Sequence, residues 1–303
     1  MHASDRSTET ALWRSILEPG DRLITPRALD PIGDLDTVRR LTLNLPAELT
    51  RPVLSTVPAA FHAEINDVLL TALALAGLDW RRRHEFGPTP GVLIALEGHG
   101  REEFAPGIDL SRTVGWFTSV FPVRLDPGPI DLDDALAGGP AAGRALKRVK
   151  EQLRALPDHG LGFGVLHYLN REFQEHPRPQ ISFNYLGRFG TGESTGDWRA
   201  VPGHGVLKGG FDDGMPVAPY SLEVNAFTQD TPAGPQLGVT WAYPSALFDE
   251  DAVRDLAGGW FAALAALVAH TVSEKSGGHT PSDLTLTTLS QDEIDEFESE
   301  WDQ

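Results

Sequence analysis

Residues 96–103, with the sequence LEGHGREE, place a carboxylate, an imidazole and a guanidinium within a few positions of one another. They follow the apolar run at residues 91–95, which is typical of a buried strand. A carboxylate at the end of such a strand is partly desolvated, which favours proton transfer, and the two glycines let a ligand approach closely. The stretch is therefore either the rim of an active site, or a turn in which Glu97 forms an ion pair with Arg101 or Arg112.

A second chemically suggestive stretch is FNYLGRF at residues 183–189, where Asn184 and Tyr185 stand at the end of a predicted strand. An amide and a phenol in that place could donate hydrogen bonds to a substrate oxygen that gains negative charge. Alternatively, Tyr185 is a buried side chain bonded to the backbone, and Asn184 shapes a turn before Gly187.

Other chemistries find less support in the sequence. His159 and His167 lie too far from a clear third ligand to indicate a metal site, so we expect none. Ser182 and Ser221 lack the turn that presents a nucleophilic serine. The chain contains no cysteine, which excludes disulfides, zinc–thiolate sites and a cysteine nucleophile.

The composition indicates a globular protein that avoids polyanions. The 303 residues carry a formal net charge of −18, which disfavours binding to nucleic acids and to anionic membranes. The first residues are polar and acidic, without the apolar core of a signal peptide, and no apolar run approaches the roughly 20 residues that cross a bilayer. We therefore expect a cytoplasmic protein.

Hydrophobic periodicity divides the chain into strands and helices. Leu41, Leu43 and Leu45 alternate as on one face of a strand, whereas apolar residues recur at helical spacing before Pro157. The pattern predicts an α+β fold with a mixed β-sheet and helices packed largely on one face. Strands are expected at 37–46, 91–97, 114–125, 179–189, 219–228 and 236–243, and helices at 66–83, 141–156 and through 253–267.

Five stretches occur in an order that is typical of one family: NDVLLTALA (66–74), LEGHGREE (96–103), RTVGWFTSVFPV (112–123), PDHGLGFGVLHYL (157–169) and FNYLGRF (183–189). Together they resemble core motifs of the epimerization domains of nonribosomal peptide synthetases, within the wider condensation-domain superfamily. Condensation domains that form peptide bonds usually read something like VGxFVNT where this chain reads VGWFTSV, and they lack EGHGRE. Both departures favour the epimerization branch.

One motif of that family does not occur. The family carries an HHxxxD motif in its other half, and none of the ten histidines of this chain begins one. The resemblance therefore implies only the C-terminal lobe of a two-lobe, chloramphenicol-acetyltransferase-like fold. We expect an N-terminal remnant or inter-lobe connector at residues 1–35, the lobe itself at residues 36–272, and a C-terminal linker with an acidic tail at residues 273–303.

The resemblance also implies roles for individual residues. Glu97 would work with the histidine of the other lobe to remove the Cα proton of a thioester-bound residue and return a proton to the opposite face. Tyr185 is the second catalytic residue that it implies. Four further residues are expected to contact the substrate or the phosphopantetheine arm: Asn184, His99, Thr118 and Ser119. For His99, a structural hydrogen bond is the alternative.

The expected function is thus part of an epimerization domain, which interconverts L- and D-residues on the phosphopantetheine arm of a carrier protein. The resemblance implies no cofactor of the chain's own, and it implies two partners, the carrier protein and the HHxxxD lobe, without which activity is not expected. A non-catalytic docking or scaffold module is the first alternative. The lobe of an amide-forming condensation domain is the second.

Overall fold

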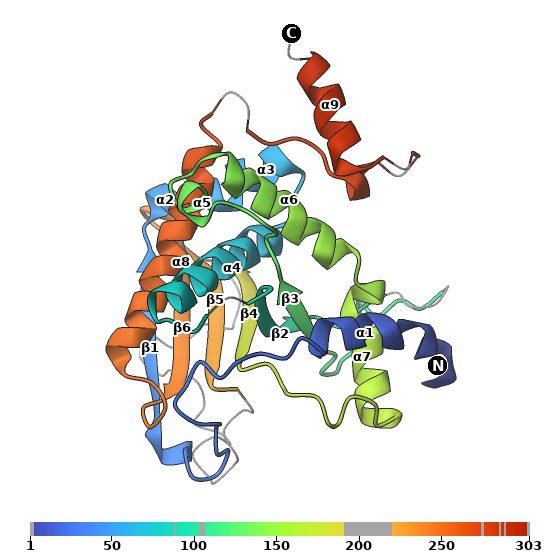
Figure 1. Ribbon diagram of the computed structural model, residues 1–303, viewed down its shortest axis with the longest axis vertical. Helices are drawn as coiled ribbons and strands as arrows, with labels where there is room; N and C mark the ends of the chain where they lie inside the picture. The colour runs from blue at the N-terminus through green and yellow to red at the C-terminus, as the bar shows by residue number, and fades with distance from the viewer. Residues whose placement is uncertain are drawn as a thin grey trace.

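The computed structural model describes residues 3–87, 89–102, 107–190, 220–273, 276–284, 286–287 and 289–301. In these ranges a sheet and a layer of helices form the body of the molecule (Figure 1). The strands are β1 Val38–Leu45, β2 Val92–Gly98, β3 Ser119–Leu125, β4 Ile181–Phe189, β5 Leu222–Thr231 and β6 Gly234–Pro244. The α-helices are α1 Thr10–Leu17, α2 Ala47–Leu54, α3 Thr56–Phe61, α4 Ile65–Arg83, α5 Leu132–Leu136, α6 Pro140–Arg154, α7 Leu161–Gly164, α8 Glu250–His270 and α9 Gln291–Trp301. Shorter helical turns are η1 Ala3–Glu9, η2 Leu35–Thr37, η3 Pro157–Gly160, η4 Val165–Leu169 and η5 Pro281–Asp283.

The sheet is mixed, as the sequence predicted. Its six strands run in the order β1-β6-β5-β4-β2-β3. Strand β4 lies between β2 and β5 and is parallel to both, whereas the other pairs are antiparallel. The three central strands therefore run in the same direction, with Glu97 near the end of β2 and Asn184 in the middle of β4.

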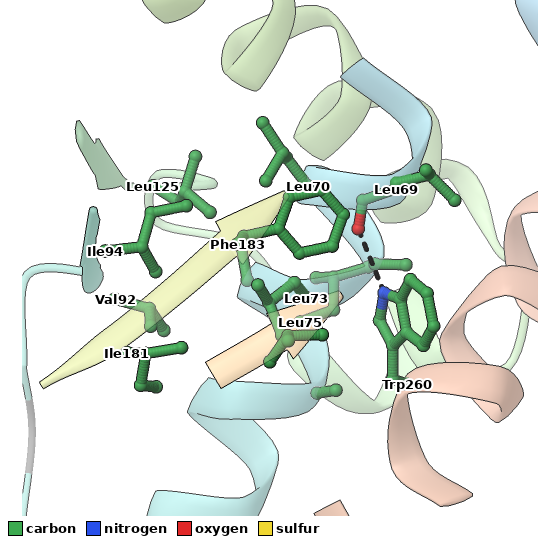
Figure 2. Close-up of a cluster of buried hydrophobic side chains, with 14 of the residues drawn as sticks. Leu69, Leu70, Leu73, Leu75, Val92, Ile94, Leu125, Ile181, Phe183 and Trp260 are labelled. Atoms are coloured by element: carbon green, nitrogen blue, oxygen red, sulfur yellow. Dashed lines mark hydrogen bonds between the residues drawn. The ribbon is translucent and has the colours of Figure 1, made fainter. Parts of the chain in front are cut away.

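One face of the sheet packs against α4 and α8, and we call it the helix-covered face. Figure 2 shows this core, in which Val92, Ile94 and Phe183 point from the strands toward the leucines of α4. Trp260 of α8 is fully buried, and its Nε1 donates a hydrogen bond to the carbonyl oxygen of Leu69, 3.0 Å away. The tryptophan therefore joins the two helices while its ring contacts the sheet.

The helices that cover the sheet were predicted in their main parts. Helix α4 begins at Ile65, where the backbone N–H of Glu64 donates to the Asp67 carboxylate at 2.7 Å and caps the first turn. Helix α6 ends just before Pro157, as expected. The short helices α2 and α3 were not predicted, because each is too short to show a helical period.

The N-terminal residues are packed onto the sheet, although their sequence shows little periodicity. Trp13 and Leu17 of α1 are buried, and the Trp13 ring lies 5.4 Å from that of Phe163. Arg124 of β3 donates hydrogen bonds to the carbonyl oxygen of Ile16. Helix α1 thus covers the edge of the sheet at β3, beside α7 (Figure 1).

A buried ion pair fixes the C-terminal segment to α6. The side chain of Lys150 is 1% exposed, and its ammonium group lies 2.6 Å and 2.8 Å from the two carboxylate oxygens of Asp283. It also donates to the carbonyl oxygen of Phe61 at 2.9 Å. Burial raises the pKa of Asp283, but hydrogen bonds from Lys150 and Thr280 outweigh this effect and leave the pKa below its ordinary value. From this anchor the chain continues to α9, which extends away from the sheet (Figure 1).

Helix α8 is long and apolar enough to cross a membrane by length and composition alone. In the described part of the chain its apolar stripe is occupied by protein contacts instead. Val253, Leu256, Trp260 and Leu264 are each at most 4% exposed. The composition of α8 is therefore that of a core helix.

We predict that Asp283→Ala lowers the free energy of unfolding by about 3 kcal/mol at neutral pH, because it leaves the Lys150 ammonium buried without its counter-charge. Since the pKa of Asp283 is lowered in the folded state, its contribution is present above the ordinary carboxyl range and is lost as pH falls through the folded value. Denaturant unfolding at several pH values measures both effects. A double variant, Lys150→Met with Asp283→Leu, should recover most of the loss, and a loss of similar size in the double variant would contradict the explanation.

Candidate functional site

Glu97 is the next-to-last residue of strand β2. Val92, Ile94 and Leu96 face the helices and are at most 7% exposed. Successive side chains of a strand point to opposite faces, so Glu97 belongs to the other face, which we call the Glu97 face. Its side chain is half-buried there. The sequence places the carboxylate at a strand end, and the packing of α4 decides which way it points.

Asn184 reaches the same face from β4. Leu96 and Phe183 are partners in the parallel register, so Glu97 and Asn184 follow side by side. The amide Nδ2 of Asn184 donates a hydrogen bond to Oε2 of Glu97, 2.9 Å away. The structure thus brings together two of the predicted site residues.

A second carboxylate lies on the Glu97 face. Glu223 of β5 is the register partner of Ser182, two positions before Asn184. Burial raises the pKa of Glu223, and the negative charge of Glu97 raises it further. Burial also raises the pKa of Glu97 itself. Tyr220, which precedes β5, has its pKa raised to about 12 by burial, with smaller contributions from Tyr168 and Glu97.

The ion pairs proposed for Glu97 as a structural alternative are not found in the described ranges. Arg101 instead donates from Nη1 to the carbonyl oxygens of Leu110, at 2.5 Å, and Thr113, at 2.9 Å. Its guanidinium also lies 4.5 Å from the centre of the Phe117 ring. Arg101 therefore holds the loop after β2, and the Glu97 carboxylate is left with an amide partner rather than a cation.

His99 lies beyond the strand end and makes structural contacts. Its Nδ1 accepts a hydrogen bond from the backbone N–H of Arg101 at 3.0 Å, and its Nε2 lies 3.5 Å from Glu102. The other carboxylate oxygen of Glu102 lies 2.7 Å from Nδ1 of His159. The imidazole of His99 thus lies in a cluster with Glu102 and His159. Its contact with substrate stays a prediction.

The two predicted residues of the third motif lie at the start of β3, which begins later than the sequence suggested. Val120 is the register partner of Glu97, and Ser119 is the partner of Gly98. The hydroxyl of Ser119 therefore points to the face opposite Glu97. Thr118 comes immediately before the strand and is exposed. Neither residue is brought into contact with Glu97, and their roles stay predictions.

Tyr185 is next to Asn184 in sequence and so points to the opposite side of β4. Its hydroxyl forms a hydrogen bond of 2.9 Å with Oγ1 of Thr228, which is fully buried. The structure does not join Tyr185 to Glu97. A direct catalytic role for its phenol would require the hydroxyl to leave Thr228.

The sequence reasoning did not identify Glu223 and Tyr220. The signal for Glu223 was present, because Leu222, Val224 and Ala226 alternate with polar residues along β5 and are all buried. An acid at an alternate position of a central strand indicates the face opposite the core. No group of three or more metal-binding side chains occurs among the described residues.

Comparisons with known proteins match the chain to one family. The family model described as "Condensation domain" matches residues 2–289. Tyrocidine synthase 2 of Brevibacillus parabrevis is 34% identical over 269 residues, covering 87% of this chain and 7% of that protein. Gramicidin S synthase 1 of Brevibacillus brevis is 32% identical over 270 residues, covering 86% of this chain and 23% of that protein. The chain thus spans a small part of these relatives.

Solved structures of related domains have a similar fold. The epimerization domain from the third module of tyrocidine synthetase B superposes with a TM-score of 0.70 at 30% identity, covering 88% of this chain and 56% of that one. The first condensation domain of the CDA synthetase gives a TM-score of 0.53 at 20% identity, over 89% of this chain and 51% of that one, which shows the fold alone. The chloramphenicol-acetyltransferase-like fold expected from the sequence is confirmed.

We predict that Glu97→Gln raises the free energy of unfolding near neutral pH, because the wild-type carboxyl must ionise where it is partly desolvated. With the pKa raised in the folded state, the folded protein holds this proton more tightly than the unfolded chain. The cost of ionisation is therefore absent well below the ordinary carboxyl range and appears as pH rises through it. Denaturant unfolding in both pH regimes measures the difference.

The same substitution at the exposed Glu175 is the matched control for the chemical change. A gain from Glu97→Gln that is equal at acid and neutral pH would contradict the desolvation of Glu97, since it would come from packing rather than from the charge.

Proposed function

The chain belongs to the condensation-domain family, and on this premise we propose that it is the catalytic-carboxylate lobe of an epimerization domain. It would act on an aminoacyl or peptidyl residue held as a thioester on the phosphopantetheine arm of a carrier protein. The reaction interconverts the L and D forms of that residue. The likeness to an epimerization domain over 88% of this chain supports an epimerization domain rather than an amide-forming condensation domain.

The observation that carries the proposal is the state of the Glu97 carboxylate. It stands at a strand end, half-buried, with the Asn184 amide at 2.9 Å. Burial raises its pKa, which brings the group nearer to the pH at which a carboxylate can both take and return a proton. A carboxylate in a surface ion pair would have the opposite shift.

The chemistry needs two proton-transfer groups on opposite faces of the substrate Cα. A base takes the Cα proton, the electron pair passes into the thioester carbonyl to give an enolate, and an acid on the other face returns a proton to Cα. Glu97 supplies one of these groups. The second would be the histidine of an HHxxxD lobe, which is not encoded within these 303 residues. Asn184 orients the carboxylate and, by donating to Oε2, supports its ionised form.

We predict that exchange at Cα depends on Glu97. With an HHxxxD lobe supplied and an aminoacylated carrier protein in D₂O, deuterium should appear at Cα because the catalytic groups exchange their protons with solvent. Glu97→Gln should slow this wash-in by roughly 10²-fold or more, the usual contribution of a general acid–base group. Mass spectrometry of the released amino acid measures it.

Two controls make the result interpretable. The epimerization domain from the third module of tyrocidine synthetase B, assayed in the same way, verifies substrate and conditions. Asn184→Leu, which removes the hydrogen bond to Glu97, should slow exchange less than Glu97→Gln. Exchange that persists in Glu97→Gln would contradict the catalytic role, and capture of a carrier protein without any exchange would indicate a docking module instead.

A further inference from the structure

An apolar pocket lies on the Glu97 face, between strands β2 and β3 and the helical segments α1, α7 and η4. It is formed by residues of α1, β2, β3, α7 with η4, and the chain leading into β4. The side chains that matter most for its chemistry are Ala95, Val120, Phe163, Tyr168, Phe173 and Tyr220. These come from segments far apart in the chain, and no single sequence motif contains them.

The pocket adjoins the Glu97 carboxylate through the strands. Ala95 precedes Glu97 by two positions and therefore lies on the same face of β2. Val120 is the register partner of Glu97 on β3, and partners in antiparallel strands have Cα atoms about 5 Å apart. Tyr220, on another wall, lies close enough for the charge of Glu97 to raise the pKa of its phenol. The mouth of the pocket is thus within one side-chain length of the carboxylate.

The walls are aromatic and largely uncharged. The rings of Phe163 and Phe173 stack with centroids 5.8 Å apart, and His167 stacks on Phe163 at 5.3 Å. Burial lowers the pKa of His167, which keeps its imidazole neutral at neutral pH. Tyr168 stands at the entrance with 69% of its surface exposed. Among the described lining residues, Arg178 is the one arginine; it is exposed, and its charge lowers the pKa of His167 and Tyr220 only as a smaller cause than burial.

We propose that this pocket receives the side chain of the residue whose Cα faces Glu97, and that it selects uncharged aromatic side chains. The inference rests on the proposed function and names its substrate class. A ring entering the pocket would pack against the exposed ring of Tyr168 and beside the stacked rings of Phe163, Phe173 and His167, contacts typical of aromatic recognition. A carboxylate would lose hydration among apolar walls and would approach the negative charges of Glu97 and Glu223.

The test uses the 303-residue chain and three N-acetylcysteamine thioesters, which differ only in the acyl group: N-acetyl-phenylalanyl, N-acetyl-aspartyl and acetyl. Methyl NMR spectra follow Leu17 and Val120, which line the pocket. The phenylalanyl thioester should shift both signals with saturable binding, whereas the other two should not. Tyr168→Ala should weaken this binding roughly three- to tenfold, the size expected for one aromatic contact.

Leu169→Ala is the matched control, because Leu169 is the next residue, is 71% exposed and does not line the pocket. Equal shifts from the acetyl thioester would overturn the proposal, since the pocket would then bind the thioester arm. Equal weakening by both alanine variants would overturn it as well. Exchange that depends on Glu97, without shifts that depend on the ring, would contradict the role of the pocket and support the proposed function. Binding of the ring without any exchange would contradict the proposed function.

Discussion

The structure depends on one constraint: the sheet is covered by its main helices on a single face. Burying Val92, Ile94 and Phe183 against α4 and α8 fixes the register of the central strands, because a shift by one residue would turn every side chain to the other side. That same requirement turns Glu97 and Asn184 away from the core. The apolar contacts of the helix-covered face therefore orient the polar groups of the opposite face, and the parallel placement of β4 beside β2 brings the amide to the carboxylate.

The Glu97 face brings two acids close together, and the charge of Arg40, which lowers the pKa of Glu223, is outweighed there by burial. Glu97 and Glu223 are both partly buried, and burial raises the pKa of each. Arg101, the cation nearest in sequence, is held by backbone carbonyls and by Phe117. Such an arrangement costs stability, and costs of this kind occur where a carboxyl group must change its protonation during a reaction. The neutral aromatic pocket beside Val120 extends the same low-polarity region toward the place where a substrate side chain would lie.

Much of this fold could be predicted from the sequence, because long periodic segments report which side is buried. Alternation identified β1, a continuous apolar run identified β2, and helical spacing identified α4, α6 and α8. The short helices α2 and α3 lack a measurable period, and α1 shows its role only through contacts with distant residues such as Phe163. Motif resemblance singled out Glu97, Asn184, Tyr185 and Ser119 as site residues. The structure joins Glu97 to Asn184 by a hydrogen bond, whereas strand alternation turns Tyr185 and Ser119 to the other side; the roles of all four stay predictions. Glu223 and the pocket come from segments that only the folded chain brings together.

The most direct test of the central claim, that the Glu97 carboxyl is the proton-transfer group, joins two pH titrations of the same assembly. A ¹³C NMR titration of the Glu97 carboxyl in the chain bound to its HHxxxD lobe gives the pKa of this group. The rate of Cα exchange on a carrier-bound substrate, followed over the same range, gives the pKa values that govern the reaction. The account predicts that one limb of the rate profile coincides with the Glu97 titration, and that Asn184→Leu displaces both to higher pH together. A rate profile that stays in place while the Glu97 titration moves would contradict it.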